Sequence, residues 1–198
     1  MFQSVGVLLD YQNVQLTARD VFLSPAAPPA DALVDPLRMA ERLVSGRRRG
    51  GELAAVRVFR GRPNPNRQAR AAAANDAQKE AWEVDRRVSV VRRNLAYRGW
   101  PDLPPIEKGI DVALAVDLIH GAMLERYDVA IVFTHDADLL PALEVTFEDT
   151  GTHLEIACWT GARPLWFPEL LREGRHLPYC HFLDERDFEG VRDRRTYV

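Results

Sequence analysis

Two kinds of apolar pattern follow one another along the chain. Short segments rich in apolar residues lie at residues 5–9, 53–59, 88–91, 129–134 and 153–159, and each predicts a strand. The first has no polar interruption, which is typical of a strand buried on both faces of a parallel sheet. Stretches with helical spacing lie at about residues 36–46, 68–83, 109–125 and 139–149. Strands and helices therefore alternate, which predicts an α/β domain with a mainly parallel sheet and right-handed crossovers.

The connecting segments and the last part of the chain are more polar. Loops rich in proline, glycine or asparagine are predicted at residues 24–29, 60–67 and 99–105. Beyond residue 160 we expect a short helix, an edge strand and a solvated polar tail at about 164–173, 179–183 and 192–195. The predicted organisation is one domain over residues 1–160 with a C-terminal extension, residues 161–198, packed on it.

Composition excludes several classes of protein. The chain has 198 residues, 46% of them hydrophobic and 28% charged, which fits one folded domain and excludes a wholly disordered chain. Its longest apolar run, residues 129–133, is far shorter than the about 20 residues of a membrane span. No signal peptide is visible, so we expect a cytoplasmic protein without membrane contacts. Cys158 and Cys180 lack the spacing of a zinc site and are expected to be buried thiols.

Charge narrows the kinds of partner. With 26 Lys and Arg against 29 Asp and Glu, the formal net charge is −3, so any nucleic-acid site has to be a local patch. Candidate cations follow the second and third strands, near Tyr97 and Trp100, whose rings can stack on bases. They are Arg60, Arg62, Arg67, Arg92, Arg93 and Arg98.

Acidic residues follow the two most apolar strands. Asp10 ends the first strand, and Asp136 and Asp138 follow the strand at 129–134. Because the carboxyl ends of parallel strands meet at one edge of a sheet, we expect these carboxylates to lie together there. Alternatively, Asp136 or Asp138 only caps the helix that begins near residue 139.

The predicted helix at 109–125 brings two more acids. Asp111 lies in its first turn, where it either joins the strand-end acids or only complements the helix dipole. The helix is apolar nearly all round and is expected to be buried, so Asp117 in its middle needs an arginine, backbone donors, a metal or a proton. Several acids at one sheet edge suit Mg²⁺ or Mn²⁺, which prefer oxygen ligands.

Three segments carry a resemblance to a known family. They are residues 8–13 (LLDYQN), 108–117 (KGIDVALAVD) and 132–141 (VFTHDADLLP). Their order and separation resemble the NYN domain, a branch of the PIN-like nuclease fold, over about residues 4–160. One departure is Thr134-His135, where the family often has serine and glycine. His135 is either a plain structural variant or a group that shapes the metal site or contacts phosphate.

The resemblance implies a fold, a chemistry and residue roles. It implies a PIN-like three-layer α/β/α sandwich and a ribonuclease that hydrolyses RNA phosphodiester bonds with Mg²⁺ or Mn²⁺. The positions that match the family's acidic metal site are Asp10, Asp111, Asp136 and Asp138, with Asp117 matching an acid later in the same helix. Asn13 matches the strand-end asparagine, and we expect it to orient a ligand or a water molecule.

Other functions compete with this one. A dehalogenase-type phosphatase needs a second carboxylate where this chain has Gln12, and a dinucleotide-binding domain needs a glycine-rich turn after the first strand. The main alternative is a PIN-like module that binds RNA or a protein without catalysis, and a toxin-type role is also open. The aromatic residues that either close the core or form a homodimer interface are Trp159, Trp166, Phe167 and Tyr179.

Overall fold

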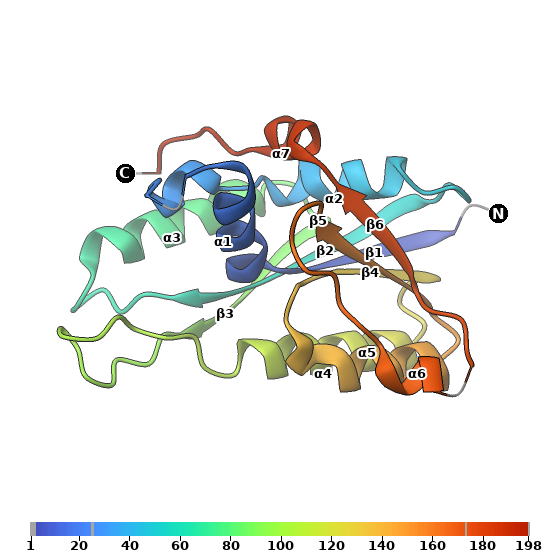
Figure 1. The fold of residues 1–198 in the computed structure, drawn as a ribbon. Helices are drawn as coiled ribbons and strands as arrows, with labels where there is room; N and C mark the ends of the chain where they lie inside the picture. Colours follow the sequence, from blue (N-terminus) through green and yellow to red (C-terminus); the bar gives the residue numbers. More distant parts are fainter. Residues whose placement is uncertain (1–2, 25, 173, 198) are drawn as a thin grey trace.

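The computed structural model describes residues 3–24, 26–172 and 174–197, and its centre is a six-stranded parallel sheet (Figure 1). The strands are β1 (Ser4–Asp10), β2 (Glu52–Arg62), β3 (Val88–Asn94), β4 (Val129–Phe133), β5 (His153–Trp159) and β6 (Tyr179–Leu183). They lie in the order β3-β2-β1-β4-β5-β6, and every neighbouring pair is parallel. The chain winds outward to β3, returns to place β4 beside β1, and then winds to the other edge. The strand order therefore reverses between β1 and β4.

Helices cover both faces of this sheet (Figure 1). One face carries α1 (Tyr11–Phe22), α2 (Pro36–Ser45), α3 (Ala69–Trp82) and α7 (Glu185–Val191), with the short 3₁₀ helix η1 (Pro29–Ala32). The other face carries α4 (Ile110–Met123), α5 (Leu140–Asp149) and α6 (Pro168–Arg172), with η2 (Ala137–Leu139). The predicted α/β/α sandwich is confirmed. Within the described ranges, no helix has the length and apolar character that crossing a membrane requires.

Each face of the sheet has its own apolar core. Val5, Val7 and Leu9 of β1 belong to the core beneath α1 and α2, whereas Leu8 of the same strand packs with residues of α4 and α5. All four side chains are 0% exposed. Burial on both faces explains why this strand is an unbroken apolar run. It also holds the last residue of the strand, Asp10, in a fixed place.

Helix α1 was not predicted from the sequence. It begins at Tyr11, directly after β1, with Gln12 and Asn13 next in the chain. The polar start of the helix gives no apolar pattern in the sequence. Its buried side consists of Tyr11, Val14 and Ala18, which follow one another at helical spacing. The helix is stabilised by this stripe against the sheet and not by a polar cap at its start.

Helix α4 was expected to be buried all round, and this expectation is wrong. Ile110, Leu114 and Leu118 are 0% exposed, but Val112 and Val116 on the other side of the helix are 64% and 61% exposed. The helix belongs to an outer layer of the sandwich, so only one of its sides can pack on the sheet (Figure 1).

The predicted solvated tail at residues 192–195 is only partly correct, because Arg194 and Arg195 are exposed but Asp193 packs into the structure. Asp193 is 3% exposed and accepts hydrogen bonds from Trp82 Nε1 at 3.0 Å and from the Tyr197 hydroxyl at 2.6 Å. Arg195 donates to both oxygens of the same carboxylate. We call residues 192–197 the C-terminal strap. The preceding helix α7 was not predicted either.

The aromatic residues of the last third of the chain fall into two groups. Trp159 and Phe167 are 0% and 1% exposed and close the core, whereas Trp166 and Tyr179 are 63% and 43% exposed. The homodimer therefore stays a prediction. The two cysteines are free thiols, and Cys158 is buried while Cys180 is half-buried.

A buried ion pair joins α2 to the far half of the sheet. Arg47, which follows α2, has a side chain only 1% exposed and contacts Glu155 of β5 at 2.9 Å. His181 of β6 contacts the other oxygen of Glu155 at 2.7 Å. Burial raises the pKa of Glu155, but hydrogen bonds from His181 and Arg47 outweigh this effect and lower the pKa to about 2. Arg47 is therefore more than a cation that complements the end of a helix.

We expect Arg47→Met to lower the free energy of unfolding by about 3–5 kcal/mol, because the substitution leaves Glu155 buried without its cation. Urea denaturation near neutral pH measures this change. The control is Arg49→Met, since Arg49 is exposed, and its effect is expected to stay within about 0.5 kcal/mol. A loss below about 1 kcal/mol for Arg47→Met would show that Glu155 does not depend on this cation.

Candidate metal centre

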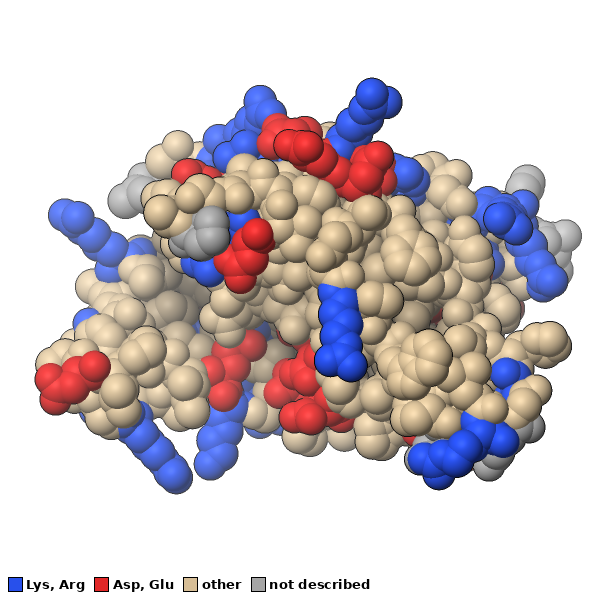
Figure 2. Space-filling view, viewed as in Figure 1, with Lys and Arg blue, Asp and Glu red and all other residues tan. Residues whose placement is uncertain are grey.

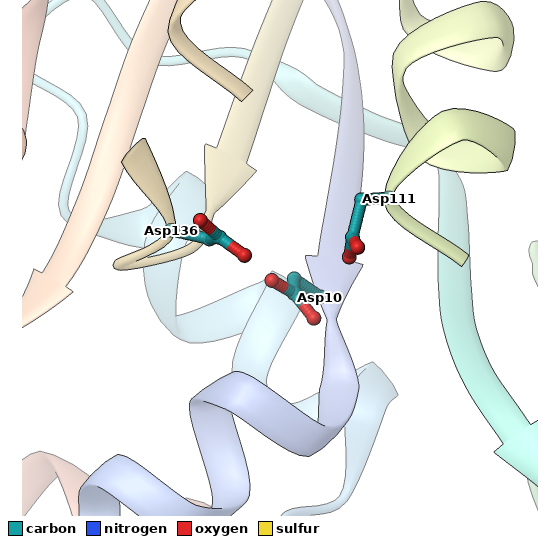
Figure 3. A group of neighbouring side chains, drawn as sticks. All are labelled: Asp10, Asp111 and Asp136. Atoms are coloured by element: carbon teal, nitrogen blue, oxygen red, sulfur yellow. The ribbon is translucent and has the colours of Figure 1, made fainter. Parts of the chain in front are cut away.

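Three carboxylates meet where the strand order reverses. Asp10 is the last residue of β1, Asp136 follows β4, and Asp111 lies in the first turn of α4. One oxygen of each residue lies within 4.8 Å of the others, and Figure 3 shows the three side chains pointing toward one another. We call these three residues the acidic cluster. The structure thus brings together three of the four acids matched to the family's metal site.

Local structure explains how each acid reaches this place. β1 and β4 are neighbours in register, with Leu9 opposite Phe133, so the segments that follow them emerge side by side. α4 approaches from a loop and begins after Gly109, whose φ of 74° is left-handed and free of strain only for glycine. The turn at Gly109 directs the first turn of the helix, and with it Asp111, toward the end of β1.

Asp10 is the most buried acid of the cluster, at 3% exposure. Burial raises the pKa of its carboxyl to about 7, and the charges of Asp111 and Asp136 also raise it. Thr134 opposes this effect with a hydrogen bond from its hydroxyl at 2.8 Å. Among the described side chains, Asp10 and Asp111 have no cation that lowers their pKa.

Asp136 has both of the roles that the sequence left open. Its side chain accepts a hydrogen bond from the backbone N–H of Asp138 at 2.9 Å and so caps η2, while its carboxylate also faces Asp10 (Figure 3). Asp138 is exposed and lies outside the acidic cluster. Burial raises the pKa of Asp111, and the charges of Asp136 and Asp138 raise it further, so Asp138 still acts on the cluster from nearby.

A further carboxylate at this site, Glu107, was not predicted. Its charge acts on Asp10, and it accepts a hydrogen bond from the backbone N–H of Gly61. Burial raises the pKa of Glu107 and the charge of Asp111 adds to this increase, while the Gly61 N–H and the charge of Arg60 oppose it. Gly61 leaves room for these contacts, since a Cβ there would lie 2.2 Å from Leu95. The one available signal was the place of Glu107 directly before the Lys-Gly-x-Asp segment.

The oxygen ligands of the cluster suit a small divalent cation. Ligands on opposite sides of Mg²⁺ lie about 4.2 Å apart. The three carboxylates already have oxygens within 4.8 Å of one another, so a small adjustment of side chains would let them bind one ion together. A cation there would also offset the repulsion that, after burial, adds to the raised pKa of Asp10.

Comparison with known proteins now assigns the chain to a family. The family model of the NYN domain matches residues 4–162. The chain belongs to the NYN domain family. A protein of unknown function from Vibrio parahaemolyticus RIMD 2210633, VPA0982, has a similar fold in its crystal structure, with a TM-score of 0.51 and 16% sequence identity over 79% of this chain and 81% of that chain. No curated protein matches the chain.

In this NYN domain, Asp117 is not part of the acidic cluster. Arg57 of β2 donates to its two oxygens at 2.8 Å and 3.1 Å. The sequence left four possible partners for Asp117, namely an arginine, backbone donors, a metal or a proton. The structure shows that the partner is an arginine, Arg57. Asp117 therefore joins α4 to the sheet.

Asn13 and His135 connect the two chain segments that carry Asp10 and Asp136. The Asn13 side-chain oxygen accepts a hydrogen bond from the backbone N–H of His135 at 2.9 Å. The His135 ring accepts from the Trp159 N–H through Nε2 at 3.4 Å, which leaves Nδ1 to donate to the Arg163 carbonyl at 3.3 Å. Both ring nitrogens thus have protein partners, as a structural variant at this position requires.

Half of the candidate arginines of the NYN domain are held by other side chains. The Arg60 guanidinium lies over the Tyr11 ring, 4.8 Å from its centre. Arg62 and Arg92 both bind Asp76 of α3, at 2.6 Å and 2.5 Å. Both arginines lie in strands, since β2 continues to Arg62. The first three residues of the loop predicted at 60–67 therefore belong to the strand.

The other candidate arginines are exposed. Arg93 and Arg98 form no ion pair within the described parts of the chain, and Arg67 lies over the ring of Tyr97 at 5.1 Å. Figure 2 shows acidic side chains near the middle of one face and at its edges, with one basic side chain beside the central acids and most others toward the rim. Cations of the NYN domain therefore lie both beside the central acids and around them.

We expect Asp10→Asn to stabilise the metal-free protein at high pH. The pKa of Asp10 is about 7 in the fold and 3.8 in the unfolded chain, so the folded state binds more protons between these values and loses stability as pH rises through them. Asparagine cannot ionise, so the variant is expected to gain at most about 4 kcal/mol near pH 8 and little near pH 4.

Urea denaturation in EDTA across this pH range measures the effect. Asp138→Asn is the matched control, because Asp138 is exposed and removing its charge should change stability far less. A gain that does not vary with pH would contradict the assignment of a raised pKa to Asp10.

Proposed function

We propose that this NYN domain is a metal-dependent ribonuclease that hydrolyses RNA phosphodiester bonds at the acidic cluster. The observation that carries the proposal is the meeting of three carboxylates within 4.8 Å of one another, with no cation among the groups that shift the pKa of Asp10 or Asp111. Asp10, Asp111 and Asp136 would hold one or two Mg²⁺ or Mn²⁺ ions. Asp138 and Glu107 are the nearby acids that extend this ligand set.

Bound divalent ions would activate a water molecule and stabilise the charge that develops on the phosphate and on the leaving oxygen. The contribution of the chain is to hold oxygen ligands in place. Thr134 fixes the carboxyl of Asp10, and the N–H of Gly61 fixes Glu107. Asn13 uses its oxygen to hold the loop at His135, which leaves its amide group to orient a ligand or a water molecule.

The proposed substrate is RNA, bound by the exposed arginines beside the acidic cluster. Arg67, Arg93 and Arg98 are the proposed phosphate contacts. Arg62 and Arg92 share the single carboxylate of Asp76, so that group keeps a net positive charge and can add to the same patch. Arg60, stacked on Tyr11, supports the strand end instead.

The nuclease proposal predicts that end-labelled RNA is cleaved in Mg²⁺ or Mn²⁺ and stays intact in EDTA. Asp136→Asn is expected to lower the rate by at least about 100-fold, because it removes a ligand charge at the metal. Gel analysis of single-stranded and hairpin RNA over time measures the rate, and product length shows whether cutting is internal.

Asp149→Asn is the matched control, since Asp149 is an exposed acid at the end of α5 that does not belong to the cluster. Its cleavage rate should equal that of the unsubstituted protein. If the unsubstituted protein binds RNA but does not cut it in either metal, the chain is the non-catalytic module that we consider the main alternative.

The arginine assignment predicts a change in salt dependence. Arg93→Gln with Arg98→Gln should weaken RNA binding and reduce the slope of log K against log salt concentration by about 1 to 2, because two phosphate contacts release fewer counterions. Fluorescence anisotropy over a salt series measures the slope. The control pair is Arg48→Gln with Arg49→Gln in the loop between α2 and β2, and an equal change in both pairs would reject the patch.

A further inference from the structure

Between β3 and α4 the chain forms an arm, residues 95–106, that extends beyond the end of the sheet (Figure 1). Ala96 and Ile106 close its base with two backbone hydrogen bonds, at 2.9 Å and 3.1 Å. Glu107 follows Ile106 directly and lies beside Asp10 and Asp111. The base of the arm therefore adjoins the acidic cluster, and we call residues 95–106 the aromatic arm.

The aromatic side chains of this arm have fixed orientations. The Tyr97 hydroxyl donates to Gln68 at 2.7 Å and accepts from the backbone N–H of Asn64 at 2.8 Å. Arg67 lies over the Tyr97 ring at 5.1 Å, and Trp100 packs edge-to-face against it at 5.5 Å. Trp100 is only half-buried, so part of its indole stays accessible. Because Tyr97 already holds the ring in place, a ligand would bind without the entropy cost of ordering this side chain.

The surface around the arm combines apolar area with unpaired positive charge. Leu103 and Ile106 are 59% and 58% exposed. Arg93, Arg98 and Lys108 are exposed and form no ion pair within the described ranges. Accessible rings and apolar side chains next to cations are what a nucleic-acid strand with unpaired bases requires.

We propose that the aromatic arm binds unpaired bases of the RNA strand that is cut, with Trp100 as the stacking residue, and that it makes the site selective for single-stranded RNA. The proposal rests on the proposed ribonuclease function and names the substrate class of that site. In a duplex, base faces are covered by neighbouring pairs and cannot stack on a side chain, whereas in a single strand they are free. The arginines bind either form, so they alone supply no such selectivity.

The test is binding of a single-stranded oligouridine of about 12 nucleotides and of a duplex of the same length, measured by anisotropy in EDTA with Asp136→Asn protein. In this background, Trp100→Ala is expected to weaken single-strand binding by roughly 5- to 150-fold. Duplex binding should change by less than about twofold, because the phosphate contacts are intact.

Tyr179→Ala is the matched control, because Tyr179 is an exposed ring that also lies beneath an arginine, Arg48, at the start of β6. It should leave both affinities unchanged. Trp100→Phe distinguishes the loss of the stacking ring from a disturbed fold of the arm. It keeps an aromatic ring and should recover most of the single-strand affinity. Equal affinity of Trp100→Ala and its parent for oligouridine, or a preference of the parent for duplex, would overturn the proposal.

This experiment separates the arm from the ribonuclease proposal. Binding is measured without metal and with a cluster variant, so it reports on the arm whether or not the protein cuts RNA. Loss of single-strand affinity in Trp100→Ala with no cleavage by the unsubstituted protein would keep the arm and reject the nuclease. Cleavage of single-stranded and duplex RNA at equal rates would keep the nuclease and reject the arm.

Discussion

The structure is organised around carboxylates that repel one another where they cannot move apart. Asp10 is held by the burial of β1 on both faces and by the hydroxyl of Thr134 at 2.8 Å. Asp136 is held by its hydrogen bond to the start of η2. Neither acid can turn toward solvent without breaking a contact that its own strand or helix end requires. The repulsion therefore persists in the folded chain, and the divalent cation that we propose for this site would relieve it.

Charges in the rest of the described chain are arranged differently. Arg47 pairs with Glu155 of the sheet strand β5, and Arg57 pairs with Asp117 of helix α4. Asp76 binds two arginines. These pairs join helices to strands on both sides of the sandwich, so their contacts help to offset the cost of leaving the acidic cluster unpaired. The contrast between paired and unpaired acids is a better guide to the site than net charge.

The sequence predicted the features that depend on local pattern and chain order. Buried parallel strands produce unbroken apolar runs, and their ends carry Asp10 and Asp136, so the sheet and the meeting of these acids could be expected. Glu107 could not, because its place depends on the close approach of the Gly61 backbone, a contact between distant segments. The same reason applies to Arg60, which looks like a surface cation in sequence and lies over a buried ring. The alternation of strands and helices along the sequence does not show which charged residues form ion pairs.

The C-terminal strap acts on the acidic cluster from a distance. Asp193 of the strap binds the indole of Trp82, and Trp82 packs against Tyr11, 4.8 Å between ring centres, directly after Asp10. The Tyr197 hydroxyl of the strap binds the same carboxylate of Asp193 at 2.6 Å. A segment far from the acidic cluster in sequence thus supports, through two aromatic rings, the packing behind the end of β1. A substitution in the strap can therefore shift Asp10 without touching it.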